Sequence, residues 1–297
     1  MADLLPEEQR SEGYGIIRMM FNLAVTFGPL LGGLLAGISY VLLFSVDAVT
    51  SMITATILLL YLRETRPESQ PGEAHSGESF VQTFQGYGTV LRDRVFMAFV
   101  LIGAAVWLVY FQMNSTLAVY LRDEHGILPR GFGVLIGLNA LIVVLMQFAI
   151  TRWLRRRGFP ALLVMAMGTL LYAVGFSMFG YVAGYTLFVT AMVIITIGEM
   201  LISPVAQATA AKFAPEHMRG RYMAMLGFGF ALASGSGTWL AGQVSKTLGF
   251  DWVWPLCGVV GTLAALGYVA MHYLTEGPVF AASLESEPRE PVADAAV

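Results

Sequence analysis

Eight long apolar stretches, almost free of charged residues, dominate the pattern of hydrophobic and polar positions along this chain. Each is about 20 residues or more, the length that an α-helix needs to cross roughly 30 Å of hydrocarbon. The stretches are Tyr14–Gly37, Tyr40–Leu62, Phe96–Leu121, Phe132–Leu154, Ala161–Tyr181, Tyr185–Val205, Tyr222–Val244 and Trp252–Tyr273. A soluble protein could not bury so many uniformly apolar helices. The pattern therefore predicts an all-α, polytopic membrane protein with eight transmembrane helices in the lipid bilayer.

The composition supports this prediction and removes several classes of function. Hydrophobic residues make up 57% of the chain and charged residues 12%, against about 25% charged residues in ordinary soluble domains. The single cysteine, Cys257, lies inside an apolar stretch, and the histidines are scattered over separate loops and ends. No nucleotide-binding loop, nucleophile elbow or zinc-protease motif occurs in the sequence. We expect no cofactor, no metal, no nucleic-acid partner and no enzymatic activity.

The positive charges predict the orientation, because cytoplasmic loops collect Lys and Arg. With the N-terminus inside, eight spans place the C-terminus inside as well. The inner segments then hold Arg10, Arg63, Arg66, Arg92, Arg94, Arg152, Arg155, Arg156, Arg157, Lys212, Arg219, Arg221 and Arg289, and Arg18 in the first inner turns of the first span joins this group. The outer segments hold only Arg122, Arg130 and Lys246. We expect a plasma or inner membrane protein with both termini in the cytoplasm.

Four regions follow from the loops between the stretches. Residues 1–62 carry the first two spans, 63–95 a cytoplasmic central loop, 96–276 six further spans, and 277–297 an acidic tail that we expect to be disordered. In the central loop, four apolar residues fall on one helical stripe: Phe80, Phe84, Tyr87 and Leu91. They predict a short amphipathic helix on the inner membrane face, although an ordinary loop with scattered aromatic residues is the alternative.

Two segments of the chain match at a separation of 209 positions. The matching pairs are Ala2 with Ala211, Pro6 with Pro215, Glu7 with Glu216, Arg10 with Arg219, Gly28 with Gly237, Leu31 with Leu240 and Gly33 with Gly242. Both copies consist of an inner loop, a glycine-rich outward span and a returning span. Copies with the same orientation indicate a parallel repeat, as in the two halves of some transporters. Four spans precede the second copy and none the first, so a six-span unit predicts that four spans of the first unit are missing here.

The residues of this repeat resemble the major facilitator superfamily. Arg18, Asn22 and the run Gly28-Pro29-Leu30-Leu31-Gly32-Gly33 are similar to a fifth-span signature of its antiporters, and Ile197-Gly198-Glu199-Met200 with Pro204 to a tenth-span pattern of bacterial drug-efflux-like members. The resemblance covers essentially the whole chain, aligned with the family's fifth to twelfth spans. It implies a twelve-span helical bundle in two halves, of which this chain holds the last eight spans, and a small-molecule substrate exchanged for protons. The family's motif after the second span has no counterpart here.

Only two acidic residues lie well inside a span, Glu199 and Asp47. An ionised carboxylate in hydrocarbon costs several kcal/mol, so each must face a cavity, find a partner or be protonated. Glu199 shares a helical face with Thr196, Ser203 and Gln207. It is a candidate for proton coupling, with a structural hydrogen-bonding role as the alternative. Asp47 is a second candidate, for which an Asp satisfied by nearby hydroxyl groups or backbone is the stronger interpretation.

Neutral polar residues inside the spans are candidates for the lining of a substrate cavity. They are Gln112, Asn114, Asn139 and Gln147, together with Ser203 and Gln207. Amides also hold helices together in lipid at about 1 kcal/mol each, so a structural role is the alternative for every one of them.

Two further groups concern conformational change. Gly28 and Gly32 are four residues apart, which lets another helix approach closely, and Pro29 removes a backbone donor. With Arg18, Asn22 and Gly33 they form a candidate hinge or interface motif between the two halves. The basic cluster Arg152, Arg155, Arg156 and Arg157 is first a signal of the cytoplasmic side, and a gating salt bridge is the alternative.

Taken together, the sequence predicts secondary transport of a small molecule, favoured as proton-coupled efflux of a drug-like or amphipathic compound. The alternative is a truncated, non-transporting remnant or one subunit of a split transporter whose other part supplies four spans.

Overall fold

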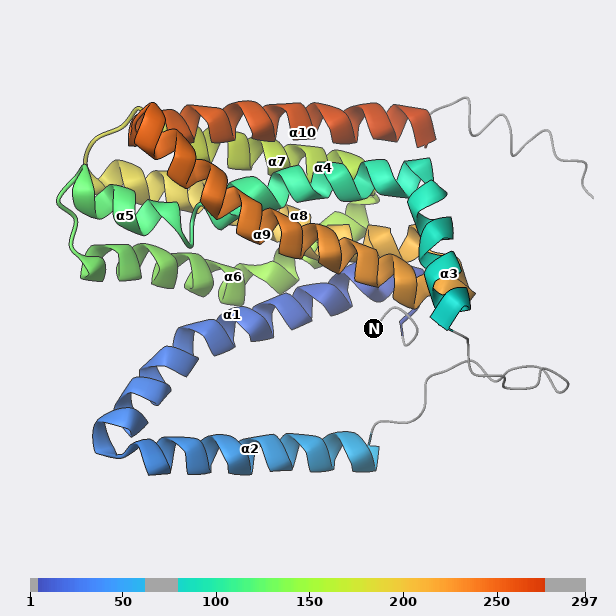
Figure 1. Cartoon of the computed structure of the whole chain (residues 1–297), viewed down its shortest axis with the longest axis horizontal. Helices are drawn as coiled ribbons and strands as arrows, with labels where there is room; N and C mark the ends of the chain where they lie inside the picture. The colour runs from blue at the N-terminus through green and yellow to red at the C-terminus, as the bar shows by residue number, and fades with distance from the viewer. Residues whose placement is uncertain (1–4, 62–79, 276–297) are drawn as a thin grey trace, which may run out of the picture.

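The chain forms a bundle of long helices (Figure 1), and this computed structural model describes residues 5–61 and 80–275. The α-helices are α1 Glu7–Ile38, α2 Tyr40–Tyr61, α3 Phe80–Arg92, α4 Arg94–Phe111, α5 Thr116–Asp123, α6 Pro129–Arg157, α7 Ala161–Met178, α8 Tyr185–Phe213, α9 Arg219–Thr247 and α10 Val253–Thr275. Short 3₁₀ turns at Glu216–Met218 and Phe250–Trp252 lead into α9 and α10. Within these two ranges every regular element is helical, which confirms the predicted all-α class.

Six helical segments of the described ranges are long and apolar enough to cross a membrane. They are Tyr40–Tyr61, Arg94–Asp123, Gly131–Arg157, Ala161–Met178, Tyr185–Phe213 and Phe250–Thr275. The other two expected spans form helices of 32 and 29 residues, α1 and α9, and are not among these six. Both are rich in glycine, which allows close packing of helices. The count of eight therefore rests, for α1 and α9, on their length and on their place in the bundle.

The third expected span, Phe96–Leu121, is not one continuous helix. It is broken into α4 and α5 by turns at residues 112–115. Polar side chains cause the break by bonding carbonyl groups one turn earlier: Gln112 Nε2 donates to Leu108 O over 2.9 Å, and Ser115 Oγ donates to Phe111 O over 2.9 Å. Such back-bonding bends helices. The other end of α4 is fixed by Asp93, which accepts from Phe96 N and from the Tyr222 hydroxyl.

The core lies between α4, α7, α8, α9 and α10. Helix α7 packs against both α8 and α10, and α4 packs against α9 and α10. Large side chains that are fully buried fill this core, among them Trp254, Tyr172, Phe176 and Phe179. A close crossing joins α7 to α8, where a Cβ on Gly198 would lie 2.6 Å from the backbone oxygen of Gly168. Glycine at this crossing therefore sets the position of α8.

Helix α1 packs against α6 and α8 at only one end of the bundle. We call this end, where α1 begins and where α6 terminates in Arg155–Arg157, the basic end. Tyr14 and Gly15 are buried there, whereas Phe27, Leu31 and Ile38 farther along α1 are exposed. In Figure 1, α1 accordingly crosses the bundle near its start and leaves it towards the opposite end.

Helix α2 stands apart from the bundle in Figure 1, joined to α1 at the opposite end. None of its residues is buried. Its exposed apolar side chains form the kind of surface that a transmembrane helix presents to lipid.

The central loop contains the helix that its apolar stripe predicts, since α3 covers Phe80–Arg92 at the basic end. Its predicted location on the membrane face stays a prediction. The stretch expected to be mobile, at residues 63–79, and the tail at 277–297 lie outside the described residues.

Candidate functional site

Glu199 lies at the centre of a buried polar network in the middle of the bundle. It is fully buried on α8, where the Gly168–Gly198 crossing fixes the backbone beside it. Asn139 on α6 donates through Nδ2 to Glu199 Oε2 over 2.8 Å and to Thr196 Oγ1 over 3.0 Å. The predicted common face of Thr196 and Glu199 is therefore confirmed, and Asn139 binds both.

The other carboxylate oxygen of Glu199 faces Arg18 on α1. The two side chains form an ion pair, with 14% of the Arg18 side chain exposed. Arg18 Nη2 also donates to the hydroxyl of Tyr110 on α4 over 2.8 Å, and this hydroxyl donates to Glu199 Oε1 over 3.2 Å. Four helices thus meet at one carboxylate, with the opposite charge supplied by α1.

Aromatic rings enclose this charge pair. Tyr110 stacks on Tyr172 with ring centroids 6.0 Å apart, and Trp107 meets Tyr110 edge-on at 5.2 Å. The Arg18 guanidinium lies 5.7 Å from the ring centroid of Phe21 and 5.8 Å from that of Tyr110. Among the described residues, Arg18 Nε has no hydrogen-bond partner. The rings surround the salt bridge with apolar surface, and one donor of the arginine stays without a described acceptor.

Gln147 on α6 satisfies a carbonyl group that a proline leaves unpaired. Pro204 lies inside α8 and has no N–H, so the carbonyl of Met200, four residues earlier, has no helical donor. Gln147 Nε2 donates to Met200 O over 3.1 Å and to Thr151 Oγ1 over 2.9 Å. These bonds join α6 to α8 one turn from Glu199 towards the basic end, and they give Gln147 a structural role.

Gln112 has a comparable position at the break between α4 and α5. Besides its bond to Leu108 O, its Nε2 donates to Gly237 O on α9 over 3.0 Å, and its Oε1 accepts from Thr116 Oγ1 over 2.6 Å. The side chain is buried. It fixes the broken span against α9.

The remaining candidates from the sequence do not join the network. Asp47 on α2 and Asn114 are exposed, and the Thr50 hydroxyl beside Asp47 donates to backbone oxygens at 46 and 47 rather than to its carboxylate. Ser203 is buried, and its hydroxyl has no hydrogen-bond partner in the described part of the chain; Gln207 is half-buried. The two intramembrane acids are therefore in different environments: Glu199 has an arginine partner and Asp47 none among the described residues.

The candidate hinge motif on α1 is described only in part. Asn22 is buried and donates through Nδ2 to Arg18 O over 2.9 Å, which supports the backbone that carries the arginine. A Cβ on Gly28 would meet nothing within 4 Å. The helix α1 runs through Pro29, Gly32 and Gly33, but their side-chain surroundings lie outside the described part of the structure.

At the basic end, the basic cluster binds α1 directly. Arg155 Nη2 pairs with Glu12 Oε1 over 2.9 Å. One turn farther into the bundle, a Cβ on Gly15 would lie 3.2 Å from Thr151 Oγ1. Arg152, Arg156 and Arg157 are exposed, and Arg152 lies 6.0 Å from the centroid of the Phe148 ring. Helices α1 and α6 are closed against each other here.

Two participants were missed by the sequence reasoning, Tyr110 and Glu12. Tyr110 belongs to an apolar, aromatic run, and its hydroxyl was the only available signal. Glu12 lies just before the first apolar stretch, where its charge looked like part of a polar terminus. Within residues 5–61 and 80–275, no cluster of three or more His, Cys, Asp or Glu residues could hold a metal ion.

Comparison with known proteins places this architecture among transporters. A family model described as Major Facilitator Superfamily matches residues 1–217 and again residues 159–295. The chain is 28% identical over 295 residues to a Na(+), Li(+), K(+)/H(+) antiporter of Planococcus maritimus, covering 92% of this chain and 69% of that protein. It is 23% identical over 278 residues to the multidrug resistance protein MdtH of Citrobacter koseri, covering 92% and 66%.

Solved structures show the same fold. The human organic anion transporter MFSD10 superimposes with a TM-score of 0.74 at 19% identity, covering 90% of this chain and 65% of that one. The chain spans between 54% and 69% of the length of the first curated relatives that it matches.

Proposed function

The chain belongs to the major facilitator superfamily of membrane transporters, and we propose that it exports a drug-like or amphipathic compound in exchange for protons. Its named relatives and structural neighbour are transporters, not enzymes. The observation that carries the proposal is the buried ion pair between Arg18 and Glu199. It links α1, from one half of the transporter, to α8, from the other.

Glu199 is the proposed proton-coupling residue. A proton on its carboxylate removes the negative charge and with it the attraction to Arg18, while Asn139 and Tyr110 can still bond the neutral acid. A buried charge left without its partner is strongly unfavourable. Protonation, ion pairing and the contact between α1 and α8 are thus coupled, which is the requirement for exchanging a proton against a substrate.

The substrate is proposed to bind between the two halves near the middle of the membrane. Its polar contacts would come from Arg18 and Asn139 and its apolar contacts from Trp107, Tyr110 and Phe21. The described conformation is closed at the basic end by Glu12, Arg155 and Gly15, while α1 leaves the bundle at the opposite end. The distribution of arginine predicts that the basic end is cytoplasmic. This conformation would then be open to the outside.

The test compares Glu199→Gln with Asp47→Asn in cells of a strain without other drug pumps. Dye efflux is measured with and without an imposed pH gradient, and Na⁺, Li⁺ and K⁺ are tested as alternative substrates in everted vesicles. We expect Glu199→Gln to abolish gradient-dependent transport and Asp47→Asn, a carboxylate outside the network, to keep it.

Two results would contradict the proposal. If Glu199→Gln exchanges protons like the unsubstituted chain, Glu199 has no coupling role. If the unsubstituted chain inserts into the membrane but moves neither dye nor cation, the alternative of a remnant or a partial subunit of a split transporter is favoured. Co-expression with a four-span partner then distinguishes a partial subunit, which should gain transport, from a remnant, which should not.

A further inference from the structure

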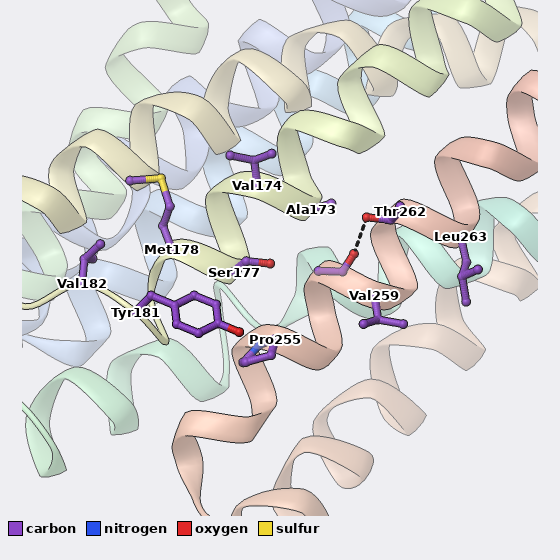
Figure 2. A pocket seen from close by; sticks show the side chains of 11 residues that line it. Ala173, Val174, Ser177, Met178, Tyr181, Val182, Pro255, Val259, Thr262 and Leu263 are labelled. Atoms are coloured by element: carbon purple, nitrogen blue, oxygen red, sulfur yellow. Dashed lines mark hydrogen bonds between the residues drawn. The ribbon is translucent and has the colours of Figure 1, made fainter.

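A groove of about 630 Å³ runs along the surface of the bundle between α7 and α10 (Figure 2). It lies on the other side of α7 from α8 and so is separate from the Arg18–Glu199 site. Its floor is made of small residues, Ala173, Ser177 and Gly258. A Cβ on Gly258 would overlap the Ser177 hydroxyl, and one on Gly261 would lie 3.1 Å from the Ala173 backbone. The groove has a deep floor because the side chains between α7 and α10 are small at these positions.

The rims of the groove are larger and exposed. Val174 on α7 is 47% exposed, and Val259 and Leu263 on α10 are 54% and 64% exposed. In Figure 2 their side chains stand on both sides of the floor. In a transmembrane helix, exposed aliphatic side chains face the hydrocarbon chains of lipid. The groove therefore opens into the bilayer and not into water.

The lining carries no charge. Its polar groups are hydroxyls, and Thr262 Oγ1 is satisfied by donating to Gly258 O over 2.8 Å. The charge of an ion or a phosphate group would have no partner of opposite charge in this lining. An apolar acyl chain has no charge or polar group that needs a partner there. It fills a space whose walls otherwise lack contact partners on one side.

The length of the groove matches one leaflet. From Pro255 to Leu263 the helix α10 rises about 12 Å, and half of a hydrocarbon core of roughly 30 Å is about 15 Å. The groove starts at Tyr181 and Pro255, next to the turn that ends α7, and leads towards the middle of the bilayer. Tyr181 and Trp252 are 75% and 55% exposed at this end, where aromatic side chains sit at the level of lipid headgroups.

We propose that this groove is a specific binding site for one acyl chain of a phospholipid from the leaflet at the end opposite the basic end. The chain lies over Ala173 and Gly258 between the rims of Val174 and Val259. The Ser177 hydroxyl, close to the interface, is placed to donate to an ester carbonyl of the same lipid. The bound lipid completes the packing of α7 against α10 on their lipid-facing side.

The test uses the purified chain in phosphatidylcholine nanodiscs that contain a phosphatidylcholine with a photoreactive acyl chain. After irradiation, labelled positions are identified by mass spectrometry. We expect labels to concentrate on residues 173–182 and 255–263, above equally exposed surfaces such as Leu145 on α6, which is 69% exposed. Val174→Trp and Val259→Trp should fill the groove and lower this labelling several-fold.

The matched control is Leu266→Trp, at a position on α10 outside the groove that is 59% exposed. It should leave the labelling unchanged, and thermal midpoints in detergent verify that all variants fold. Uniform labelling of all exposed helices, or equal labelling in Val259→Trp and Leu266→Trp, would overturn the proposal. Preferential labelling by a photoreactive free fatty acid, or cross-links between two copies through residues 255–263, would also overturn it.

Discussion

The hydroxyl of Tyr110 lies between the two charges of the site, 3.2 Å from Glu199 Oε1 and 2.8 Å from Arg18 Nη2. It accepts from the arginine and donates to the carboxylate, so it takes part in the ion pair without carrying charge. Hydrogen bonds to charged groups are the stronger ones in proteins. Tyr110 therefore connects α4 to the contact between α1 and α8.

Replacing Tyr110 by Phe should destabilise the folded protein by about 1–3 kcal/mol, because both charged partners lose a buried hydrogen bond. The ring contacts with Trp107 and Tyr172 remain. Thermal unfolding in detergent measures the change. Tyr268→Phe on α10 is the control, since Tyr268 is a fully buried tyrosine outside the network around Glu199, and equal losses in both variants would contradict the assigned role.

Arg18 and Glu199 should show strong coupling in a double-mutant cycle. Arg18→Met alone leaves a buried carboxylate unpaired and should cost about 3–5 kcal/mol. Adding Glu199→Gln removes the remaining charge and should restore most of the stability, although proton-driven transport stays lost. Chemical unfolding of the two single variants and the double variant gives the coupling energy, and additive effects would show that the pair is not formed.

Gln147 and Pro204 should be coupled through the carbonyl of Met200. Gln147→Leu leaves that buried carbonyl without a donor and should cost about 1–3 kcal/mol. In the Pro204→Ala background residue 204 has an N–H that can bond Met200 O, so the same substitution should cost clearly less. An equal cost in both backgrounds would assign the effect of Gln147 to its contact with Thr151 instead.

Gly198→Ala should destabilise the α7–α8 crossing by about 1–3 kcal/mol, since the added methyl group meets backbone that cannot move aside easily. Gly137→Ala on α6 is a matched control, because a Cβ there meets nothing within 4 Å. Alanine favours a helix interior over glycine by about 1 kcal/mol, so the control should be neutral or stabilising. Thermal midpoints compare the two, and an unchanged midpoint for Gly198→Ala would argue against the close approach.

The Glu12–Arg155 pair should affect conformation more than stability. An ion pair this exposed contributes about 0–1 kcal/mol, yet it holds α1 against α6. Glu12→Arg should open the basic end, which is measured as faster thiol labelling of Thr151→Cys; the native Cys257 is buried and gives a low background. The reversed pair, Glu12→Arg with Arg155→Glu, should restore slow labelling, and failure to do so would exclude the ion pair as the cause.

The helices were predictable from sequence because the thickness of a bilayer imposes a minimum length of apolar sequence on every span. The shared face of Thr196 and Glu199 followed from helical periodicity in the same way. What the sequence could not predict depends on contacts between helices. Glu199 and Asp47 look alike as intramembrane acids, and only the position of Arg18 on a distant helix separates them.

The same limit applies to the amides. Gln112, Asn139 and Gln147 were equal candidates for a substrate cavity, but Asn139 binds the carboxylate while the two glutamines bond backbone carbonyls. The proline that explains Gln147 is visible in the sequence, whereas its distance from residue 147 is a property of the packed bundle. The break at 112–115 was missed because its polar residues were assigned to a cavity lining instead of to the backbone they disrupt.

The interruption between α4 and α5 also divides the third span into two pieces that are held separately. Asp93 fixes the start of α4 through Phe96 N and the Tyr222 hydroxyl. Beyond the turns at 112–115, α5 has anchors of its own, since the Tyr120 hydroxyl donates to Phe179 O over 2.8 Å and Leu117 and Leu121 are buried. The position of Tyr110 at the charge pair therefore does not depend on a rigid connection to α5.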